Sequence, residues 1–331
     1  MERSWYGGVQ AEEKRGNCES RERKELLAAG MSRPRFFVAF RGSLWPSLGA
    51  VQVFLNGRLV PEGQAVVSVF DRGFLYGDGI FETMRILNGK PFRWKQHWER
   101  FENGAAFLKI ASPFSSEALR DFANRLVLEN QMPDSLLRLT LSRGIGIRGY
   151  SPRAAERPTI VMSVHPAPAF DPEQTVGWRL IIAPVKLPEQ EPLAQFKTCN
   201  KLPQIIARAR ADALGADEAL LLNTDDRLVE SSSGNLFWLE QEVVCTPPLA
   251  SGVLPGVTRG VIFEVCSGMD MAVREAKVRA PDLYQKSGVF LSLSSVGIAE
   301  GLSLDGKPLA RSPIVEKLNK RYWDLVRTET A

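Results

Sequence analysis

Two short runs of β-forming residues flank Asn56-Gly57, and the same arrangement recurs around Asn88-Gly89. An Asn-Gly pair between such runs favours a tight β-hairpin, because both residues tolerate a positive φ. The runs "AVVSVF", "LLRLTLS" and "TIVMSV" predict further strands. Residues 94–110 and 116–130 carry apolar side chains at helical spacing. Residues 51–166 therefore predict a small α+β domain with helices on one side of its sheet.

A Pro-rich polar segment, "APAFDPEQ", follows this part of the chain and predicts a linker over 167–175. Beyond it, "WRLIIAPV", "EALLLN", "LVE", "NLFWLE", "EVVCTP" and residues 289–293 predict strands. Helices are expected at 201–214, 257–267 and 313–327, the last with Ser312 as N-cap and Pro313 at its first position. Residues 176–331 therefore predict a larger, β-rich domain with helices.

Residues 1–50 lack this patterning. They hold nine Lys or Arg and six Glu, a net charge of 9 − 6 = +3. We expect a disordered segment or a loose helix there. Our hypothesis is that the folded enzyme begins near Val51 and that the assigned start lies upstream of the real one; a transit peptide is the alternative.

The composition restricts the class of protein. Hydrophobic residues make up 44% and charged residues 24%, the balance of a soluble globular protein. Beyond residue 50 the chain is nearly neutral and has no long apolar run. We therefore expect no nucleic-acid partner, no membrane span and a cytoplasmic location. Four cysteines without a CxxC pair and only two histidines leave little material for a metal site or a Ser-His-Asp triad.

The segment "GIGIRG", Gly144 to Gly149, fits the G-x-G-x-x-G pattern of dinucleotide-binding proteins. In that site the third glycine must open a helix. Pro152 and Pro158 follow Gly149 too closely for a helix to begin there. The better interpretation is a Gly-rich loop that presents Arg143, Arg148 and Tyr150.

Lys197 lies in "QFKTCNKLPQ", four residues before Lys201. Glu230 ends a short predicted strand in "LVESSSGNLFW", beside small hydroxyl residues. Taken alone, this motif favours a surface hairpin with a solvated Glu230 over a ligand site. No G-x-S-x-G is present, so a hydrolase nucleophile is not supported.

Gly256, Val257 and Thr258 lie just before, or on the first turn of, an apolar helix. Free N–H groups and the positive end of the helix dipole favour a phosphate at such a place, although a simple N-cap is the alternative. Arg100, in "HWERF", could grip a phosphate with two N–H groups or lie on a solvated helix face.

Lys197, Glu230 and the helix N-terminus at 256–258 are more informative together than singly. A lysine, a carboxylate 33 positions later and a helix N-terminus suited to phosphate are what a pyridoxal 5′-phosphate (PLP) site requires. The lysine can bind the aldehyde covalently, the carboxylate can keep the pyridine nitrogen protonated, and backbone N–H groups can hold the phosphate.

The chain resembles the fold-type IV, class IV aminotransferase family of PLP enzymes. The resemblance runs from about Val51 to the C-terminus, through five motifs in the family's order. They are "DRGFLYGDGIFETMR", "HWERF", "KTCNKL", "DEALLLN…LVESSSGNLF" and "GVLPGVTRG". The family includes branched-chain aminotransferases, D-amino-acid aminotransferases and 4-amino-4-deoxychorismate lyases. The fold that the resemblance implies has a small N-terminal α+β domain and a larger PLP-binding domain.

The resemblance also implies roles for single residues. Lys197, rather than Lys201, matches the lysine of the family's K-x-x-N motif and should be the catalytic residue that holds PLP. Glu230 matches the partner of the pyridine nitrogen. Arg100, Val257 and Thr258 match the groups that bind the phosphate. Lys201 is then an ordinary residue of the following helix.

The family further implies a homodimer whose active site lies between two domains and near the interface. Residues 71–79 should border the site, so that Tyr76 could reach the cofactor or substrate. Arg148 matches a carboxylate-binding arginine of the D-amino-acid enzymes. Tyr150 stands near a position that is often His in those enzymes.

The loop "SRGIGIRGYSP" looks most like that of the lyases. It therefore favours a 4-amino-4-deoxychorismate lyase of folate biosynthesis, which releases pyruvate and p-aminobenzoate from a small carboxylate substrate. The alternative is an aminotransferase for D-amino or branched-chain amino acids. A PLP-binding module without catalysis is disfavoured, because the lysine, the carboxylate and the phosphate elements are all present.

Overall fold

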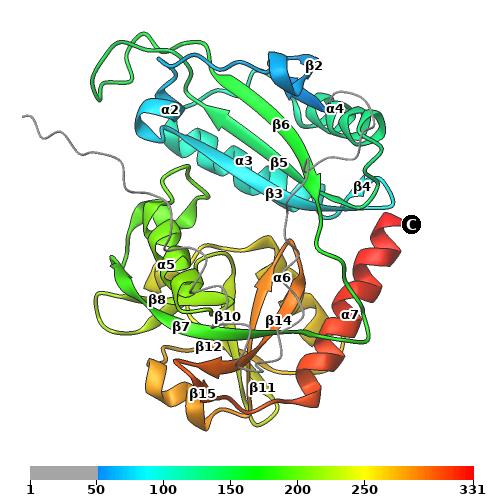
Figure 1. Cartoon of the computed structure of the whole chain (residues 1–331), viewed down its shortest axis with the longest axis vertical. Helices are drawn as coiled ribbons and strands as arrows, with labels where there is room; N and C mark the ends of the chain where they lie inside the picture. The colour runs from blue at the N-terminus through cyan, green and yellow to red at the C-terminus, as the bar shows by residue number, and fades with distance from the viewer. Residues whose placement is uncertain (1–50) are drawn as a thin grey trace, which may run out of the picture. The chain divides into compact units, whose positions relative to one another are not determined.

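A six-stranded antiparallel sheet opens the described part of the chain, residues 51–331 of a computed structural model (Figure 1). Its strands run in the order β2-β1-β6-β5-β3-β4. Their bounds are β1 (Gln52–Leu55), β2 (Arg58–Pro61), β3 (Gly79–Leu87), β4 (Lys90–Pro91), β5 (Ser135–Ser142) and β6 (Thr159–Pro166). The predictions for residues 1–50 lie outside the described residues.

Both predicted hairpins are confirmed. Asn56 and Gly57 join β1 to β2 with φ angles of 47° and 92°, and Asn88 and Gly89 join β3 to β4 with 52° and 77°. A positive φ at both central residues is the geometry that makes Asn-Gly the preferred pair in a two-residue hairpin.

Helices α3 (Trp94–Leu108) and α4 (Ser116–Glu129) cover one face of this sheet, as the sequence predicts. Leu137, Leu139 and Leu141 point to the same face of β5, because side chains alternate along a strand. They share one buried cluster with Phe101 of α3 and Leu119 of α4.

The strand predicted for "AVVSVF", residues 65–70, is wrong. The segment is an irregular stretch without a sheet partner, and Val66 and Phe70 are exposed. A short helix, α2 (Arg72–Tyr76), follows it and was not predicted. Asp71 caps that helix by accepting the Gly73 N–H at 2.7 Å, and Gly77, with φ 66°, ends it. The apolar run reflects exposed surface rather than a strand.

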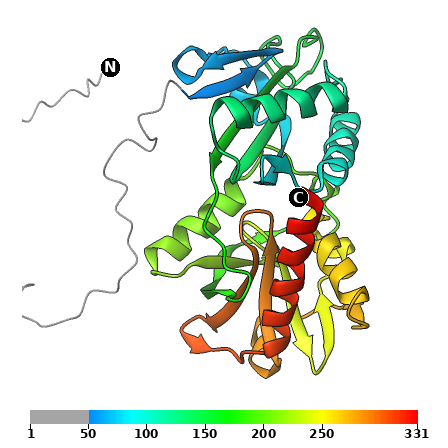
Figure 2. The same ribbon diagram turned by 90° about the vertical axis from the view of Figure 1, so that its right-hand side faces the viewer.

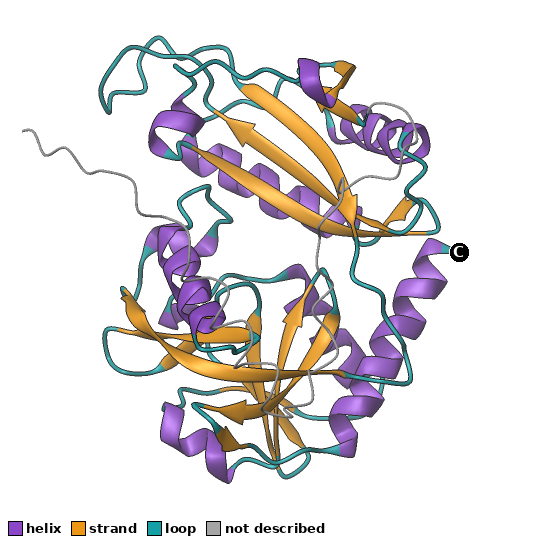
Figure 3. Ribbon diagram, in the orientation of Figure 1, coloured by secondary structure: helices purple, strands orange, loops and turns teal. Residues whose placement is uncertain are grey.

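A nine-stranded sheet forms from residues 176–308 (Figure 3). Strands β10, β13, β14, β7, β8 and β9 follow one another, and β9 also pairs with β10, so these six close into a ring. The bounds are β7 (Val176–Leu187), β8 (Glu218–Asn223), β9 (Leu228–Ser231), β10 (Asn235–Glu240), β11 (Val243–Thr246), β12 (Val273–Glu275), β13 (Gly288–Leu293), β14 (Gly297–Leu304) and β15 (Lys307–Pro308). The sequence missed β12, β14 and β15.

Three helices accompany this sheet, and all three were predicted. They are α5 (Leu202–Ala213), α6 (Val257–Ser267) and α7 (Pro313–Thr330). Ser312 caps α7 by accepting the Ile314 N–H, as its position before Pro313 predicts. The far end of α7 reaches the β3–β4 hairpin, where the Lys90 ammonium donates to the Ala331 carbonyl (Figure 2).

Leu87 of β3 and Phe92, just after β4, belong to a buried cluster that is otherwise built around the second sheet. Tyr322 and Trp323 of α7 lie in the same cluster. The described residues form one compact unit. The division into domains at 51–166 and 176–331 therefore stays a prediction. Within residues 51–331, no helix is both long and apolar enough to cross a membrane.

Candidate functional site

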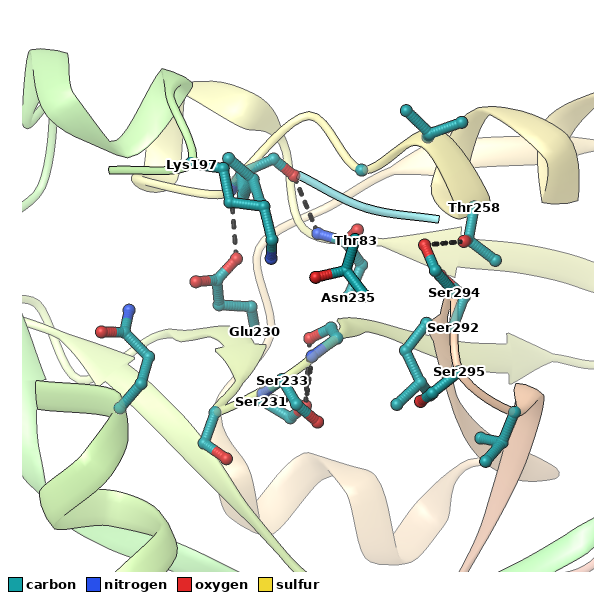
Figure 4. A pocket seen from close by; sticks show the side chains of 18 of the residues that line it. Thr83, Lys197, Glu230, Ser231, Ser233, Asn235, Thr258, Ser292, Ser294 and Ser295 are labelled. Carbon is teal, nitrogen blue, oxygen red and sulfur yellow. Dashed lines mark hydrogen bonds between the residues drawn. The ribbon is translucent and has the colours of Figure 1, made fainter. Parts of the chain in front are cut away.

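A cavity of about 560 Å³ is lined by residues of both sheets. Its walls include Phe81, Arg100, Lys197, Glu230, Thr258 and Ser294. This volume lies within the range typical of cofactor and small-ligand sites, about 300–1,000 Å³. Figure 4 shows the side chains of Lys197 and Glu230 directed into the same space, with Thr258 and Ser294 on another wall. The structure thus brings together five residues that the sequence singled out for PLP: Arg100, Lys197, Glu230, Val257 and Thr258.

Backbone hydrogen bonds to β3 hold Lys197 in place. The Phe81 N–H donates to the Lys197 carbonyl at 2.9 Å, and the Cys199 N–H donates to the Gly79 carbonyl at 2.9 Å. The segment before α5 therefore adds to the edge of β3 as a short extra strand. The Lys197 ammonium lies 4.8 Å from the centre of the Phe81 ring.

The environment of Lys197 disfavours its charged form. Burial and the positive charge of Arg100 lower the pKa of Lys197 to about 8, against the opposing effect of Glu82. Within the described residues, its ammonium makes no hydrogen bond or ion pair. A lysine that is partly neutral near pH 8 and free of partners is suited to attack an aldehyde.

Glu230 lies at the ring closure, where it pairs with Asn235 of β10. One carboxylate oxygen accepts the Leu254 N–H at 3.1 Å. Burial raises the pKa of Glu230, and the Leu254 N–H and the charges of Lys201 and Lys197 oppose the rise. An acceptor in this setting fits a ring N–H, because a protonated pyridine nitrogen would supply the cation that a buried carboxylate requires.

The buried carboxylate of Glu218 fixes the turn after Glu230 by hydrogen bonds. Glu218 is fully buried and accepts the hydroxyls of Ser232 and Ser233, as well as the Ala219 N–H at 2.7 Å. Ser232 and Ser233 line the cavity. The serine-rich stretch is therefore anchored, and the alternative of a solvated hairpin does not describe it.

Helix α6 presents its N-terminus to the cavity without a side-chain cap. Gly256 at the N-cap is required, because a Cβ there would lie 2.0 Å from the Asn235 side-chain oxygen. Thr258 adds a hydroxyl 3.4 Å from that of Ser294. Uncapped N–H groups at Val257 and Thr258, with these hydroxyls, fit a phosphate.

Arg100 lies on the cavity wall in a fixed orientation. It grips Glu82 with two parallel hydrogen bonds, from Nε and Nη2, each 2.7 Å long. Its Nη1 donates to the Pro255 carbonyl at 3.0 Å, one residue before the α6 N-cap. One N–H on each terminal nitrogen is left over, and the guanidinium cannot turn away without breaking the pair with Glu82.

Glu82 was missed by the sequence analysis. It is almost fully buried, on β3, and its second partner is the Nδ1 atom of His97 at 2.7 Å. Burial raises the pKa of Glu82, but Arg100 and His97 outweigh it and hold the value at about 2. Burial lowers the pKa of His97, so its ring is neutral and Nδ1–H donates to the carboxylate. A glutamate inside the apolar strand "GIFETMRIL" was the available signal.

Lys201 also needs a correction. It is the residue just before α5 and lines the cavity, rather than being an ordinary residue of the helix. Burial lowers its pKa, while the charge of Glu230 opposes that shift. Its position four residues after Lys197 gave no signal of this, because helical spacing does not apply to a segment that precedes α5.

Tyr76, Arg148 and Tyr150, the candidates for substrate binding, do not line this cavity. Tyr150 is 88% exposed, and Arg148 is exposed as well. The Tyr76 hydroxyl accepts the Gly149 N–H at 3.1 Å, so α2 and the 143–158 loop are in contact. Tyr76 and Tyr150 also contact each other, with ring centres 5.7 Å apart.

Arg85, a buried residue of β3, ties other cavity segments together. It donates to the carbonyls of Pro168 at 3.2 Å and Ser295 at 3.0 Å, and it pairs with Asp134. Pro168 and Ser295 both line the cavity. Within residues 51–331, no group of His, Cys, Asp and Glu is arranged to hold a metal ion.

Fold and site together define a PLP enzyme of fold type IV. Residues 79–304 match the model of the family described as "Amino-transferase class IV". The chain belongs to this family. PLP is its cofactor, and the protein is a lyase or an aminotransferase that acts on small amino or carboxylate compounds.

Several relatives are similar over most of the chain. A Methanocaldococcus jannaschii protein with the provisional name branched-chain-amino-acid aminotransferase is 32% identical over 83% of this chain and 96% of its own. The aminodeoxychorismate lyase of Vibrio harveyi is 32% identical over 71% of this chain and 86% of its own. Other relatives are named D-alanine aminotransferases.

The similar solved structures also include both aminotransferases and lyases. The branched-chain aminotransferase of Thermoproteus uzoniensis has a TM-score of 0.78 and 26% identity, covering 85% of this chain and 96% of its own. The 4-amino-4-deoxychorismate lyase of Pseudomonas aeruginosa has a TM-score of 0.71 and 32% identity, covering 84% and 98%.

The first prediction concerns Glu82. Glu82→Gln should weaken PLP binding, because a neutral amide holds Arg100 less firmly. A loss of about 2 kcal/mol corresponds to about thirtyfold in Kd. Fluorescence titration of the PLP-free protein measures this, and Glu99→Gln, on the exposed side of α3, is the control. An unchanged Kd in a folded Glu82→Gln protein would show that Arg100 does not depend on Glu82.

The second prediction concerns pH. In PLP-free protein, acylation of Lys197 should rise with pH around a midpoint of about 8. Exposed Lys95 of α3 is the reference for reagent access. Peptide mass spectrometry after brief treatment with an amine-selective reagent resolves the two residues. Acylation of Lys197 that shows no midpoint near pH 8 would contradict the expected environment of this residue.

Proposed function

We propose that the protein is a PLP-dependent 4-amino-4-deoxychorismate lyase that releases pyruvate and p-aminobenzoate for folate synthesis in the cytoplasm. The observation that carries the proposal is the 142–152 loop, "SRGIGIRGYSP", which resembles the corresponding loop of the lyases. The 32% identity to the Pseudomonas aeruginosa lyase supports it, against 26% for the Thermoproteus uzoniensis aminotransferase.

The cavity residues divide the binding of PLP among themselves in this proposal. Arg100 and the N–H groups of Val257 and Thr258 hold the phosphate. Glu230 accepts a hydrogen bond from the pyridine nitrogen, and Lys197 binds the aldehyde carbon. Bound PLP supplies an electron sink for the carbon that carries the substrate amino group.

Once the substrate amino group has replaced it on the aldehyde carbon, Lys197 would be a free amine that can move the proton. With a pKa near 8 it can take the proton from the amino-bearing carbon and return one later. In the lyase reaction the electron pair of that C–H bond becomes a ring double bond. The bond from the neighbouring ring carbon to the enolpyruvyl oxygen breaks, the departing group gains a proton at its methylene carbon to become pyruvate, and the remaining ring is aromatic.

Aminodeoxychorismate carries two carboxylates, and arginines suit such groups because they bind them with two N–H donors. Arg148 is one candidate. Arg138 of β5 is another, since its guanidinium carbon lies 3.8 Å from the centre of the cavity residue Phe81. Within residues 51–331 the Arg138 guanidinium makes no hydrogen bond or ion pair.

The alternative is an aminotransferase for branched-chain or D-amino acids. The similarity to the Methanocaldococcus jannaschii protein, over 83% of this chain, favours it. The same cavity would serve, because a transaminase also needs Lys197 to move a proton from the substrate. The difference lies in where the proton returns and in the need for a 2-oxo acid acceptor.

We further propose a homodimer. Large apolar side chains are exposed on three segments: Val66, Val69, Phe70, Phe74, Ile145, Ile147, Tyr150, Leu202, Ile205 and Ile206. The segments are neighbours, because Asp71 bridges to Ile145 and Asn200 donates to the Gly77 carbonyl at 3.1 Å. An apolar surface of this extent is typical of an interface. A second copy would cover it and bring Arg148 and Tyr150 towards an active site.

The decisive test is product analysis with aminodeoxychorismate and no added 2-oxo acid. A lyase should release p-aminobenzoate and pyruvate in equal amounts over many turnovers, and Lys197→Ala should release neither. If the PLP-loaded protein forms no p-aminobenzoate but converts D- or L-amino acids with 2-oxoglutarate, the aminotransferase is the right assignment.

The dimer has its own test. Light scattering after gel filtration should give twice the chain mass, and Ile205→Asp should shift the protein towards the monomer. Asp at the exposed Leu128 of α4, away from these segments, is the control. A monomeric wild-type protein with full activity would rule the dimer out.

A further inference from the structure

The 143–158 loop, which carries Arg148 and Tyr150, is built around one buried side chain of α2. Arg72 is 3% exposed, although it lies in a short surface helix. Its Nη1 donates to the carbonyls of Gly149 at 2.8 Å and Ser151 at 3.1 Å, and its Nη2 donates to the Tyr150 carbonyl at 3.0 Å. One guanidinium therefore holds three successive carbonyls of the loop.

Two glycines of "GIGIRG" have no room for a side chain. A Cβ on Gly146 would lie 2.9 Å from Cδ of Arg72 and 3.0 Å from Cβ of Ala155. A Cβ on Gly144 would lie 1.8 Å from the Arg157 carbonyl oxygen. Close packing within the loop and against Arg72 thus explains Gly144 and Gly146, and a positive φ of 107° explains Gly149.

Asp78 completes the support. It accepts Arg72 Nε at 2.8 Å and Arg143 Nε at 2.8 Å, and so joins α2 to the stem of the loop. Burial raises the pKa of Asp78, but the hydrogen bonds from Arg143 and Arg72 outweigh it and lower the value, so the carboxylate stays ionised near neutral pH. Tyr76 adds its hydroxyl as acceptor for the Gly149 N–H and its ring beneath the Arg72 guanidinium, 5.0 Å away.

Arg148 itself makes none of these contacts. Within residues 51–331 its side chain has no hydrogen bond or ion pair, and it projects from the backbone that Arg72 fixes on the C-terminal side. A free guanidinium on a rigid backbone loses less conformational freedom when it binds a carboxylate than one on a mobile loop.

We propose that Arg72 is a positioning residue: by holding the carbonyls of 149–151, it orients Arg148 for recognition of the substrate carboxylate. This inference rests on the proposed role of Arg148 in the dimeric enzyme. It does not depend on whether the reaction is a lyase or an aminotransferase reaction, because both substrates carry a carboxylate.

The test is a double-mutant cycle in the PLP-loaded enzyme, with whichever substrate it converts. Arg72→Lys keeps a cation beside Asp78 but lacks the planar fork that reaches three carbonyls. It should raise KM about tenfold and leave kcat within about twofold, and in an Arg148→Met background it should change KM less than twofold. Arg153→Lys, at an exposed site of the same loop, is the matched control.

Limited trypsin digestion gives a second readout that needs no activity. Arg72→Lys should speed cleavage after Arg148, because the loop backbone becomes mobile. Gly146→Ala is an independent variant, since it pushes the loop off Arg72 without removing a charge, and it should raise KM and cleavage together. It decides the question if Arg72→Lys does not fold.

The outcomes separate the two proposals. A KM effect of Arg72→Lys that persists in the Arg148→Met background would overturn the inference, because Arg72 would then act by another route. Unchanged KM and unchanged cleavage would overturn it too. If Arg148→Met alone leaves KM unchanged while Arg72→Lys speeds cleavage, the proposed role of Arg148 fails and the positioning role fails with it, whereas the proposed reaction is judged by its products.

Discussion

The hydrogen bonds between residues 197–199 and the start of β3 are the contact on which the site depends. They attach a segment that leads into α5 to a strand of the other sheet. Lys197 is thereby fixed in front of Phe81, while Glu230 and the N-terminus of α6 come from elements that surround the second sheet. The aldehyde, the pyridine nitrogen and the phosphate of PLP lie far apart on the molecule. A PLP site therefore requires a contact of this kind, because each of the three groups must meet a different part of the chain.

The charges around this junction are arranged so that few are left uncompensated. Arg100 is paired with Glu82, and Glu82 is also paired with neutral His97. Within residues 51–331 the Lys197 ammonium has no hydrogen-bond or ion-pair partner, and burial together with the charge of Arg100 lowers its pKa to about 8. Buried charges are costly unless paired, so an unpaired lysine and a carboxylate with a raised pKa at one cavity mark places where a ligand completes the set.

The sequence predicted this site better than its surroundings. Lys197, Glu230, Arg100 and the α6 N-terminus carry family motifs, and the structure brings them to one cavity. Helix α6 begins and ends at the predicted residues, because the Gly256 turn and the apolar spacing both mark it.

The failures have physical reasons. Residues 65–70 are rich in β-forming types, but no neighbouring strand pairs with them, and pairing is a tertiary property. Strand β14 contains Gly297 and Gly301. Glycine is depleted in strands, so the residue propensities did not indicate a strand there. Glu82 pairs with His97 and Arg100, and Lys201 is influenced by the charge of Glu230. These neighbours are 15 or more residues away in the sequence. The exposure of Arg148 and Tyr150 follows from a loop that folds around Arg72.

Leu87 and Phe92 have a consequence for how a substrate enters. These side chains come from the edge of the first sheet, yet they are buried among residues of α6, α7 and the second sheet. Separating the sheets there would expose them to water, at about 1.5–3 kcal/mol for each large apolar side chain. Opening of the cavity by separating the two sheets is therefore disfavoured by about 3–6 kcal/mol. Substrate entry and product release then depend on movement of the loops at the cavity opening. The distance between the cavity walls that enclose the cofactor ring is fixed when the chain folds.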